Sequence, residues 1–324
     1  MSGRVSIIIR CLNEEAHIGR LLSGIERQTL PADEVIVVDS GSTDATLAIA
    51  SRFNTKIVEI APEEFSFGRA LNVGLDASTG EFAVLASAHV YPIYDSWLER
   101  LVNPLVTNTK TAVSYGRQTT PPDGRFSESR LMQQWFPAES VDSQEHPFHN
   151  NANAAIRRDV WAEHPYDEEL TGLEDLDWGK RILARGHLIS YVAEAPIVHV
   201  HNESFAQIQN RYRREAIAHR RIYAEQRMSA ASATRLAFAN IAGDMGAAAR
   251  ERRLLREGRG IVEFRTAQFL GTWQGFAQEG PLTKTLKHRF YYPADNATSA
   301  DGISEEIGNP LEYDDVPVDG RTGR

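Results

Sequence analysis

The fold is indicated most clearly by the segment Val35-Ile36-Val37-Val38-Asp39-Ser40-Gly41-Ser42-Thr43-Asp44. Its first half is apolar and β-branched, as in a buried parallel strand. Its second half has a glycine for a tight turn and hydroxyl side chains that can cap a helix. Asp39 stands where the strand ends, so its carboxylate can accept hydrogen bonds from the base or ribose of a nucleoside. The same pattern also suits an ordinary strand-turn-helix connection with Asp44 in the first helical turn.

The alternation of strands and helices continues on both sides of this stretch. We expect strands at residues 5–10, 34–38, 56–60, 82–86, 112–115, 152–156, 188–192 and 196–199, and helices at 13–28, 45–53, 68–77, 96–105, 158–163 and 175–185. This order predicts an α/β fold with a mostly parallel sheet flanked by helices, whose ligand lies beyond the carboxyl ends of the strands. The irregular segment 119–151 is long enough to serve as a binding loop. The sequence has no G-x-G-x-x-G motif, so it lacks the phosphate loop of a dinucleotide-binding fold.

The character of the chain changes after residue 203. We expect helices at 204–226, 230–256 and 260–276, the first of them rich in arginine. From residue 294 onward Asp, Glu, Gly and Pro dominate, so we expect a disordered acidic tail. The predicted organisation is an α/β domain at 1–203, a helical extension at 204–293 and a tail at 294–324. The arginine-rich helix face is either solvated or a contact surface for an acceptor, a membrane surface or a second subunit.

The overall composition limits the classes of function. The net charge of −9 argues against a nucleic-acid-binding chain, because such domains are usually basic. Cys11 is the one cysteine, so the chain can form no intrachain disulfide, and we expect a small buried side chain at a strand end. No stretch has the length of a membrane-spanning helix, and the start lacks the features of a signal peptide. We therefore expect a cytoplasmic protein, with the inner face of the membrane as an alternative location.

Two polar clusters fall at places where a site can form. Glu174, Asp175 and Asp177 begin a predicted helix, where they can cap the helix or supply a carboxylate for chemistry. Adjacent helical residues point about 100° apart, so Glu174 and Asp175 face differently. His199 and His201 lie two residues apart at a strand end and point to the same face. There they can share a metal ion, meet a phosphate or form ordinary hydrogen bonds.

An ordered set of segments resembles glycosyltransferase family 2. The segments are Val5–Glu15, Val37–Asp44, Phe65–Asn72 followed by Gly80-Glu81, Gly172–Trp178 and Val198–Asn202. The resemblance covers about residues 4–215 and is closest to the bacterial rhamnosyltransferase-like branch of the family. It implies a GT-A fold for residues 1–203, in a domain that binds a nucleotide sugar and transfers the sugar with inversion at the anomeric carbon.

The resemblance also implies roles for individual residues. Asp175 would be the general base that takes the proton of an acceptor hydroxyl, with Glu174 beside it. The donor-binding positions that it implies are Asp39, at the nucleoside, and Cys11, Asn13, Glu15, Ser42, Arg69, Asn72, Ser87, His89, Asn153 and Trp178. Alternatives stay open for three of these: a surface ion pair for Arg69, a structural turn for Asn153 and core packing for Trp178.

His89 departs from the family pattern. The strand expected at 82–86 usually leads to an Asp-x-Asp or Ser-x-Asp motif whose last aspartate holds Mg²⁺ or Mn²⁺ against the donor diphosphate. Here Ser87-Ala88-His89 stands in that place. An imidazole is a poor ligand for Mg²⁺ but binds softer transition ions. His89 can therefore hold a metal with His199 and His201, touch the diphosphate directly or be structural. The implied cofactor is a divalent cation, Mn²⁺ or Mg²⁺.

The resulting interpretation is an inverting glycosyltransferase. It would move a sugar from an NDP-sugar to a hydroxyl of a glycan or glycolipid acceptor, in cell-surface polysaccharide or glycolipid synthesis. One alternative is a nucleotidyltransferase, but residues 10–15 contain no glycine for its phosphate loop. Another is a non-catalytic nucleotide-sugar-binding scaffold in a polysaccharide assembly complex, against which the retained Asp39, Glu174 and Asp175 argue. No nucleic-acid partner is expected, whereas peripheral membrane contact and a homo-oligomer stay open.

Overall fold

The computed structural model describes residues 3–278 and 309–313. Its centre is an eight-stranded sheet with the strand order β3-β2-β1-β4-β7-β6-β8-β5. The strands are β1 Val5–Cys11, β2 Glu34–Asp39, β3 Thr55–Glu59, β4 Phe82–Ser87, β5 Val90–Pro92, β6 Thr111–Thr119, β7 Asn153–Arg157 and β8 Leu188–His199. β5 and β7 run antiparallel to their neighbours, and the other pairs are parallel. The expected α/β fold with a mostly parallel sheet is thus confirmed.

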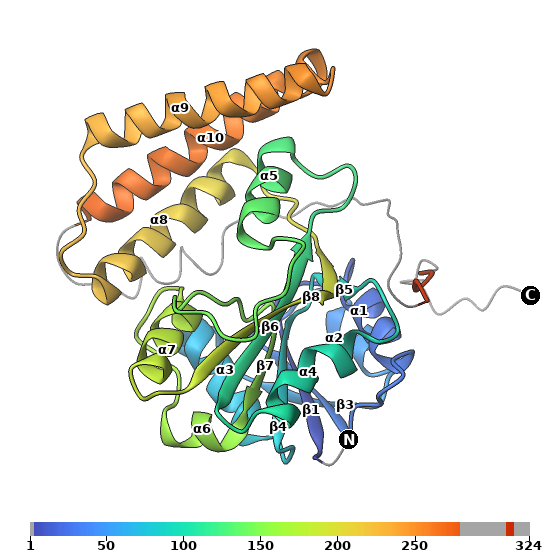
Figure 1. Cartoon of the computed structure of the whole chain (residues 1–324). Helices are drawn as coiled ribbons and strands as arrows, with labels where there is room; N and C mark the ends of the chain where they lie inside the picture. Colours follow the sequence, from blue (N-terminus) through green and yellow to red (C-terminus); the bar gives the residue numbers. More distant parts are fainter. Residues whose placement is uncertain (1–2, 279–308, 314–324) are drawn as a thin grey trace, which may run out of the picture.

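Helices cover both faces of this sheet (Figure 1). They are α1 Ile18–Glu26, α2 Thr46–Ala50, α3 Phe67–Asp76, α4 Trp97–Thr107, α5 Phe126–Trp135, α6 Arg158–Glu163 and α7 Glu174–Leu183, with a 3₁₀ turn η1 at Pro62–Glu64. One core layer contains Ile7, Leu21 and Trp97, and the other contains Ile8 and Leu71. Because side chains alternate along a strand, adjacent residues of β1 enter different layers.

Several expectations about the elements need correction. The segment 119–151 is not wholly irregular, because it contains α5, whose Phe126, Leu131 and Met132 are buried. The two short strands expected at 188–199 form the single strand β8, which has a register shift where it pairs with β6. The helix expected from residue 13 begins at Ile18, since the residues before it form turns.

A layer of three long helices lies beyond α5 (Figure 1). These helices are α8 Phe205–Ile222, α9 Ala230–Arg250 and α10 Leu254–Ala277. α10 approaches α8 closely at Gly271, where an added Cβ would lie 2.1 Å from the carbonyl oxygen of Gln209. Asp244 of α9 accepts hydrogen bonds from Arg265 of α10 and Arg130 of α5, both at 2.8 Å. The helical extension is therefore tied to the α/β domain through α5 and α8.

Residues 309–313 lie against the α/β domain. The N–H of Leu311 donates to the carbonyl of Ile93 at 3.0 Å, and the hydroxyl of Tyr313 donates to the carbonyl of Pro92 at 2.6 Å. The expectation of a disordered tail at 294–324 therefore does not hold for these five residues, and the rest of that stretch lies outside the described residues. Among the helices in the described part of the chain, none combines the length and apolar character needed to cross a bilayer.

Candidate functional site

A cavity of about 790 Å³ lies where β1, β4 and β8 end. This is the edge at which α/β sheets bind ligands, and the volume suits a small molecule. The expected site residues that line it are Asn13, Glu15, Ser87, His89, Glu174, Asp175, His199 and His201. Further lining comes from Arg10, Glu14, Phe67, Asn151, Glu203, Arg211 and Arg214. The structure thus brings both polar clusters of the sequence to one cavity.

The loops that follow β1 and β2 form one side of the cavity, here called the polar wall, which contributes Asn13, Glu15, Thr43 and Asp44 to the lining. The N–H of Asn13 donates to Ser42 Oγ at 2.9 Å, and Asn13 Oδ1 accepts from the N–H of Thr43 at 2.8 Å. The Glu15 carboxylate accepts from the N–H of Ala45 at 2.9 Å. Asn13 has a φ of 54°, in the left-handed region that asparagine enters more readily than most residues. These hydrogen bonds fix the polar wall between loops that are distant in sequence.

Asp39 lies behind the polar wall and outside the cavity lining. Its carboxylate is buried and accepts hydrogen bonds from the N–H groups of Gly41 and Ser42, both at 2.9 Å. Gly41 has a φ of 97°, which an L side chain would adopt only with strain. The Cys11 thiol lies 3.4 Å from the same carboxylate, and burial together with this negative charge raises its pKa. Asp39, Cys11 and Ser42 therefore order the loop, and the structure does not place their side chains in the cavity.

Asp175 lies in the first turn of α7, at the cavity. The preceding Leu173 has a φ of 55°, which is unusual for a residue other than glycine, asparagine or aspartate and is a form of strain found at functional sites. The Asp175 carboxylate accepts hydrogen bonds from the N–H of Leu176 at 2.8 Å and of Asn151 at 3.4 Å. Burial and the negative charge of Glu174 raise the pKa of Asp175 to about 8. A carboxyl group with this pKa can exchange a proton near neutral pH.

The other acidic residues of this turn have cationic partners. Glu174 is buried and forms an ion pair with Arg10 at 3.2 Å. Asp177 pairs with Arg181, one turn along the helix, at 2.8 Å. Asp175 has no such ion pair among the described residues, so it is the acid of the turn that borders the cavity without a cationic partner.

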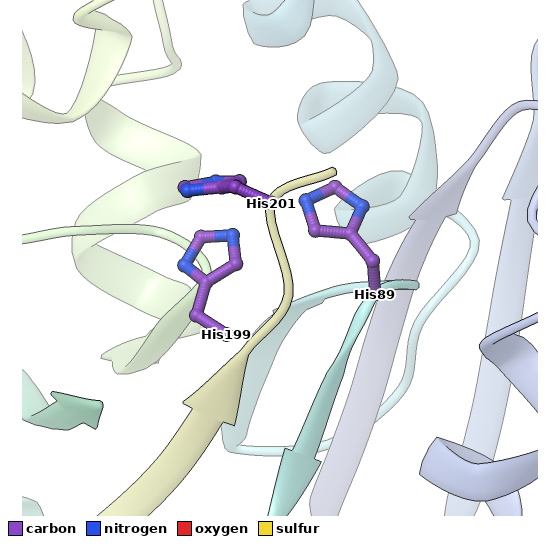
Figure 2. A group of neighbouring side chains, drawn as sticks. All are labelled: His89, His199 and His201. Carbon is purple, nitrogen blue, oxygen red and sulfur yellow. The ribbon is translucent and has the colours of Figure 1, made fainter. Parts of the chain in front are cut away.

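His89, His199 and His201 form a second group, here called the histidine cluster. Figure 2 shows their rings beside one another, and one ring nitrogen of each lies within 4.8 Å of the others. β5 brings them together, because Val90 at its start pairs with His199 at the end of β8. Burial and the two neighbouring histidines lower the pKa of His199, which favours the neutral form of this ring. Burial alone would lower the pKa of His89, but Glu14 raises it overall.

Three residues that the sequence did not single out contact the histidine cluster: Glu14, Gln118 and Glu128. Glu128 also pairs with Arg211 of α8 at 3.3 Å, and Arg211 pairs with Glu203 at 2.6 Å. Glu128 lies in the segment expected to be irregular, 73 residues before its histidine partner. No local sequence pattern could have predicted the contact between Glu128 and His201. The one available indication of buried carboxylates near α8 was the high arginine content of this helix.

Four further expected donor positions lie outside the cavity lining, and their side chains make contacts elsewhere in the fold. The Trp178 side chain is fully buried in the core, as its alternative interpretation held. Asn153 is also fully buried and donates to backbone carbonyls of β6 and β8 at 3.1 and 2.9 Å. Asn72 donates to the carbonyl of Tyr166 at 3.0 Å. Arg69 forms ion pairs with two surface carboxylates, at 2.9 and 3.3 Å.

The fold is similar to that of solved glycosyltransferases. One of them is the mannosyltransferase PcManGT from Pyrobaculum calidifontis, in complex with GDP-Man and Mn²⁺. The TM-score is 0.53 and the identity 18%, and the match covers 91% of this chain and 89% of that one. At this identity the likeness concerns the fold, which is of the GT-A type.

Sequence relatives are glycosyltransferases as well. The chain is 30% identical to the glycosyltransferase AglE of Haloferax volcanii over 199 residues, 58% of this chain and 64% of the relative. It is 28% identical to the O-antigen chain rhamnosyltransferase WbaN of Salmonella anatum over 198 residues, 58% of this chain and 62% of the relative. The chain thus spans less than two thirds of the length of each of these relatives.

The family model of glycosyl transferase family 2 matches residues 6–164. This range contains the polar wall and His89, and it ends before α7. Residues 6–164 of this chain are a glycosyl transferase family 2 domain.

Proposed function

We propose that this chain is a glycosyltransferase that moves a sugar from a nucleoside-diphosphate sugar to a hydroxyl group of an acceptor. The observation that carries the proposal is one cavity lined by the polar wall, the histidine cluster and Asp175. The polar wall could bind the nucleoside, the histidine cluster could hold a cation at the diphosphate, and Asp175 could take the proton of the reacting hydroxyl. The family 2 domain and the glycosyltransferases among its relatives support the same activity.

The donor would lie along the polar wall and the histidine cluster. Asn13 and Glu15 line the cavity, where the Asn13 amide could donate or accept a hydrogen bond with the nucleoside and the Glu15 carboxylate could accept one. Asp39 keeps the loop in place from behind. The histidine cluster fits a divalent cation, because His199 Nε2 is buried and has no hydrogen-bond partner among the described residues. When bound there, such an ion supplies positive charge to the departing diphosphate.

Asp175 would act on the acceptor as general base. The acceptor oxygen forms a bond to the anomeric carbon, the bond from that carbon to the donor phosphate oxygen breaks, and the hydroxyl proton passes to Asp175. One displacement of this kind inverts the anomeric centre. A hydroxyl group gives up its proton only as the new bond develops, so a carboxylate with a raised pKa is a suitable acceptor for it.

The name of one relative supports a proposal for the acceptor class. WbaN is named an O-antigen chain rhamnosyltransferase, so we propose that this chain also acts in polysaccharide or glycolipid synthesis, on a glycan or glycolipid acceptor. Arg10, Arg211 and Arg214 line the cavity among a larger number of acidic residues, and Arg10 and Arg211 already pair with carboxylates, so the charge of the lining does not favour an anionic acceptor.

The test is an assay of nucleoside diphosphate release and sugar transfer with UDP-, GDP- and dTDP-sugars. Donor binding is first detected as a thermal shift, with and without Mn²⁺. The Asp175→Asn variant should bind the donor but turn it over about 100- to 10,000-fold more slowly.

Asp177→Asn is the matched control for this test, because Asp177 lies in the same helical turn and pairs with Arg181. It should keep turnover close to that of the wild type. Equal turnover in the Asp175→Asn variant would remove the base assignment, and binding without turnover in the wild type would favour a scaffold.

A further inference from the structure

Carboxylates hold two rings of the histidine cluster on the Nδ1 side. Glu14 Oε1 lies 2.6 Å from His89 Nδ1, and Glu128 Oε1 lies 2.6 Å from His201 Nδ1. An ionised carboxylate can only accept a hydrogen bond, so each of these rings must carry its proton on Nδ1. The lone pair of the neutral ring is then on Nε2, which is the arrangement found in carboxylate-histidine-metal sites.

His199 completes the cluster from the buried side. Its Nδ1 lies 2.7 Å from Gln118 Oε1, and its Nε2 is buried without a hydrogen-bond partner among the described residues. A buried ring nitrogen of this kind has its lone pair available for an ion. Because a glutamine amide can be turned either way, the assignment of proton positions rests on Glu14 and Glu128.

Glu128 is itself fixed from behind. It is buried in α5 and contacts Arg211 of α8 at 3.3 Å. Arg211 in turn donates hydrogen bonds to the Glu203 carboxylate, from Nε at 2.9 and 3.0 Å and from Nη2 at 2.6 Å. Contacts from α5 and α8 therefore set the position of the His201 ring. Side chains held in this way keep a site in its binding geometry before the ligand arrives.

We propose that Glu14 and Glu128 are positioning residues that present His89 and His201, together with His199, to one divalent ion, and that this all-imidazole set selects Mn²⁺ over Mg²⁺. Mg²⁺ takes oxygen ligands and dehydrates reluctantly, whereas imidazole suits transition ions. The inference rests on the proposed function, which places the ion at the donor diphosphate, but it concerns the binding of the ion itself.

The experiment measures ion binding directly, on the metal-free full chain without donor. Mn²⁺ is titrated by electron paramagnetic resonance and calorimetry, and Mg²⁺ by calorimetry. Mn²⁺ should bind at least about tenfold more tightly than Mg²⁺. Glu128→Gln and Glu14→Gln keep the side-chain shape but not the charge, and each should weaken Mn²⁺ binding by about 10- to 100-fold.

Glu15→Gln is the matched control, because it removes the same charge from the residue next to Glu14, which lines the same cavity. The Glu15 carboxylate accepts from the N–H of Ala45 and contacts no histidine of the cluster among the described residues. Its Mn²⁺ affinity should equal that of the wild type. Glu14 and Glu128 lie on separate elements, so a folding defect in one variant, detected by thermal melting, leaves the other as a test. Equal affinities for Mn²⁺ and Mg²⁺, or an unchanged Mn²⁺ affinity in a folded Glu14→Gln or Glu128→Gln variant, overturn the inference.

Transfer assays separate this inference from the proposed function. If the ion titrations come out as expected and no sugar is transferred, the proposed function fails and the inference stands. If the ion titrations overturn the inference and sugar is still transferred, for example equally well with Mg²⁺ or after chelation, the inference fails and the proposed function stands.

Discussion

Asp175 sets the pH dependence expected of the proposed reaction. Burial and the negative charge of Glu174 raise its pKa to about 8, so the carboxyl group is protonated in ligand-free protein below this pH. The base form therefore accumulates as the pH rises. We expect kcat/KM to increase by about tenfold per pH unit on the acidic side and to level off above about pH 8. The measurement is a pH profile of kcat/KM at constant ionic strength.

Glu174→Gln provides the internal check of this prediction. The substitution removes the negative charge beside Asp175 and leaves Arg10 without its carboxylate partner. Both changes favour the ionised form of Asp175, so the acidic limb of the profile should move to lower pH. An acidic limb that stays in place would show that another group controls it.

For single residues, the sequence predicted which residues belong to the site better than it predicted the contacts of their side chains. Asp175 and the histidine cluster lie at the ends of a helix and of strands, in motifs that can be recognised from their order along the sequence. The structure brings these residues together in the cavity. Asn153 and Trp178 also stand in such motifs, yet their side chains are buried in the core. A motif fixes the position along the chain but not which way a side chain turns, because that depends on packing from distant elements.

At the scale of elements, the contact between α8 and α10 depends on Gly271. A Cβ at this position would lie 2.1 Å from the carbonyl oxygen of Gln209, so Gly271→Ala forces the helices apart and should lower the free energy of unfolding by about 1–3 kcal/mol. Gly260→Ala is the matched control in the same helix, because nothing lies within 4 Å of its added Cβ. It should raise stability by roughly 0.5–1 kcal/mol. Urea unfolding measures both changes, and destabilisation of equal size in both would contradict the packing argument.

The elements themselves were largely predictable, since buried strands and one-sided helices have distinct periodicities. β1, β2 and β4 were expected within a residue of their observed ends. α5 was missed because its short apolar face lies among Pro, Gly and Ser residues. Its packing against the helical extension, where Arg130 of α5 pairs with Asp244 of α9, becomes visible only in the structure. The close approach at Gly271 was not predictable either, because a helical glycine alone does not reveal what lies opposite.

At the scale of the whole molecule, the cavity combines parts that the sequence assigned to different domains. α8 was expected to begin a separate helical extension at residue 204, but Gln207, Arg211 and Arg214 of this helix line the cavity. A division of the chain at residue 203 therefore passes through the site. We propose that the α/β domain and α8 act as one unit and that α9 and α10 support α8 from behind.

Tyr313 joins the far end of the described chain to the same unit. Its hydroxyl donates to the carbonyl of Pro92 at the end of β5, its ring lies 5.1 Å from that of Tyr91, and the Arg27 guanidinium lies 4.7 Å over it. Tyr313→Ala removes all three contacts and should lower the free energy of unfolding by roughly 1–3 kcal/mol, whereas Tyr313→Phe loses only the hydrogen bond and about 1 kcal/mol. Because β5 begins directly after His89, hydrogen exchange of the β5 amides should also be faster in Tyr313→Ala than in Tyr313→Phe. Wild-type stability and exchange in the alanine variant would mean that this contact does not support the strand beside the histidine cluster.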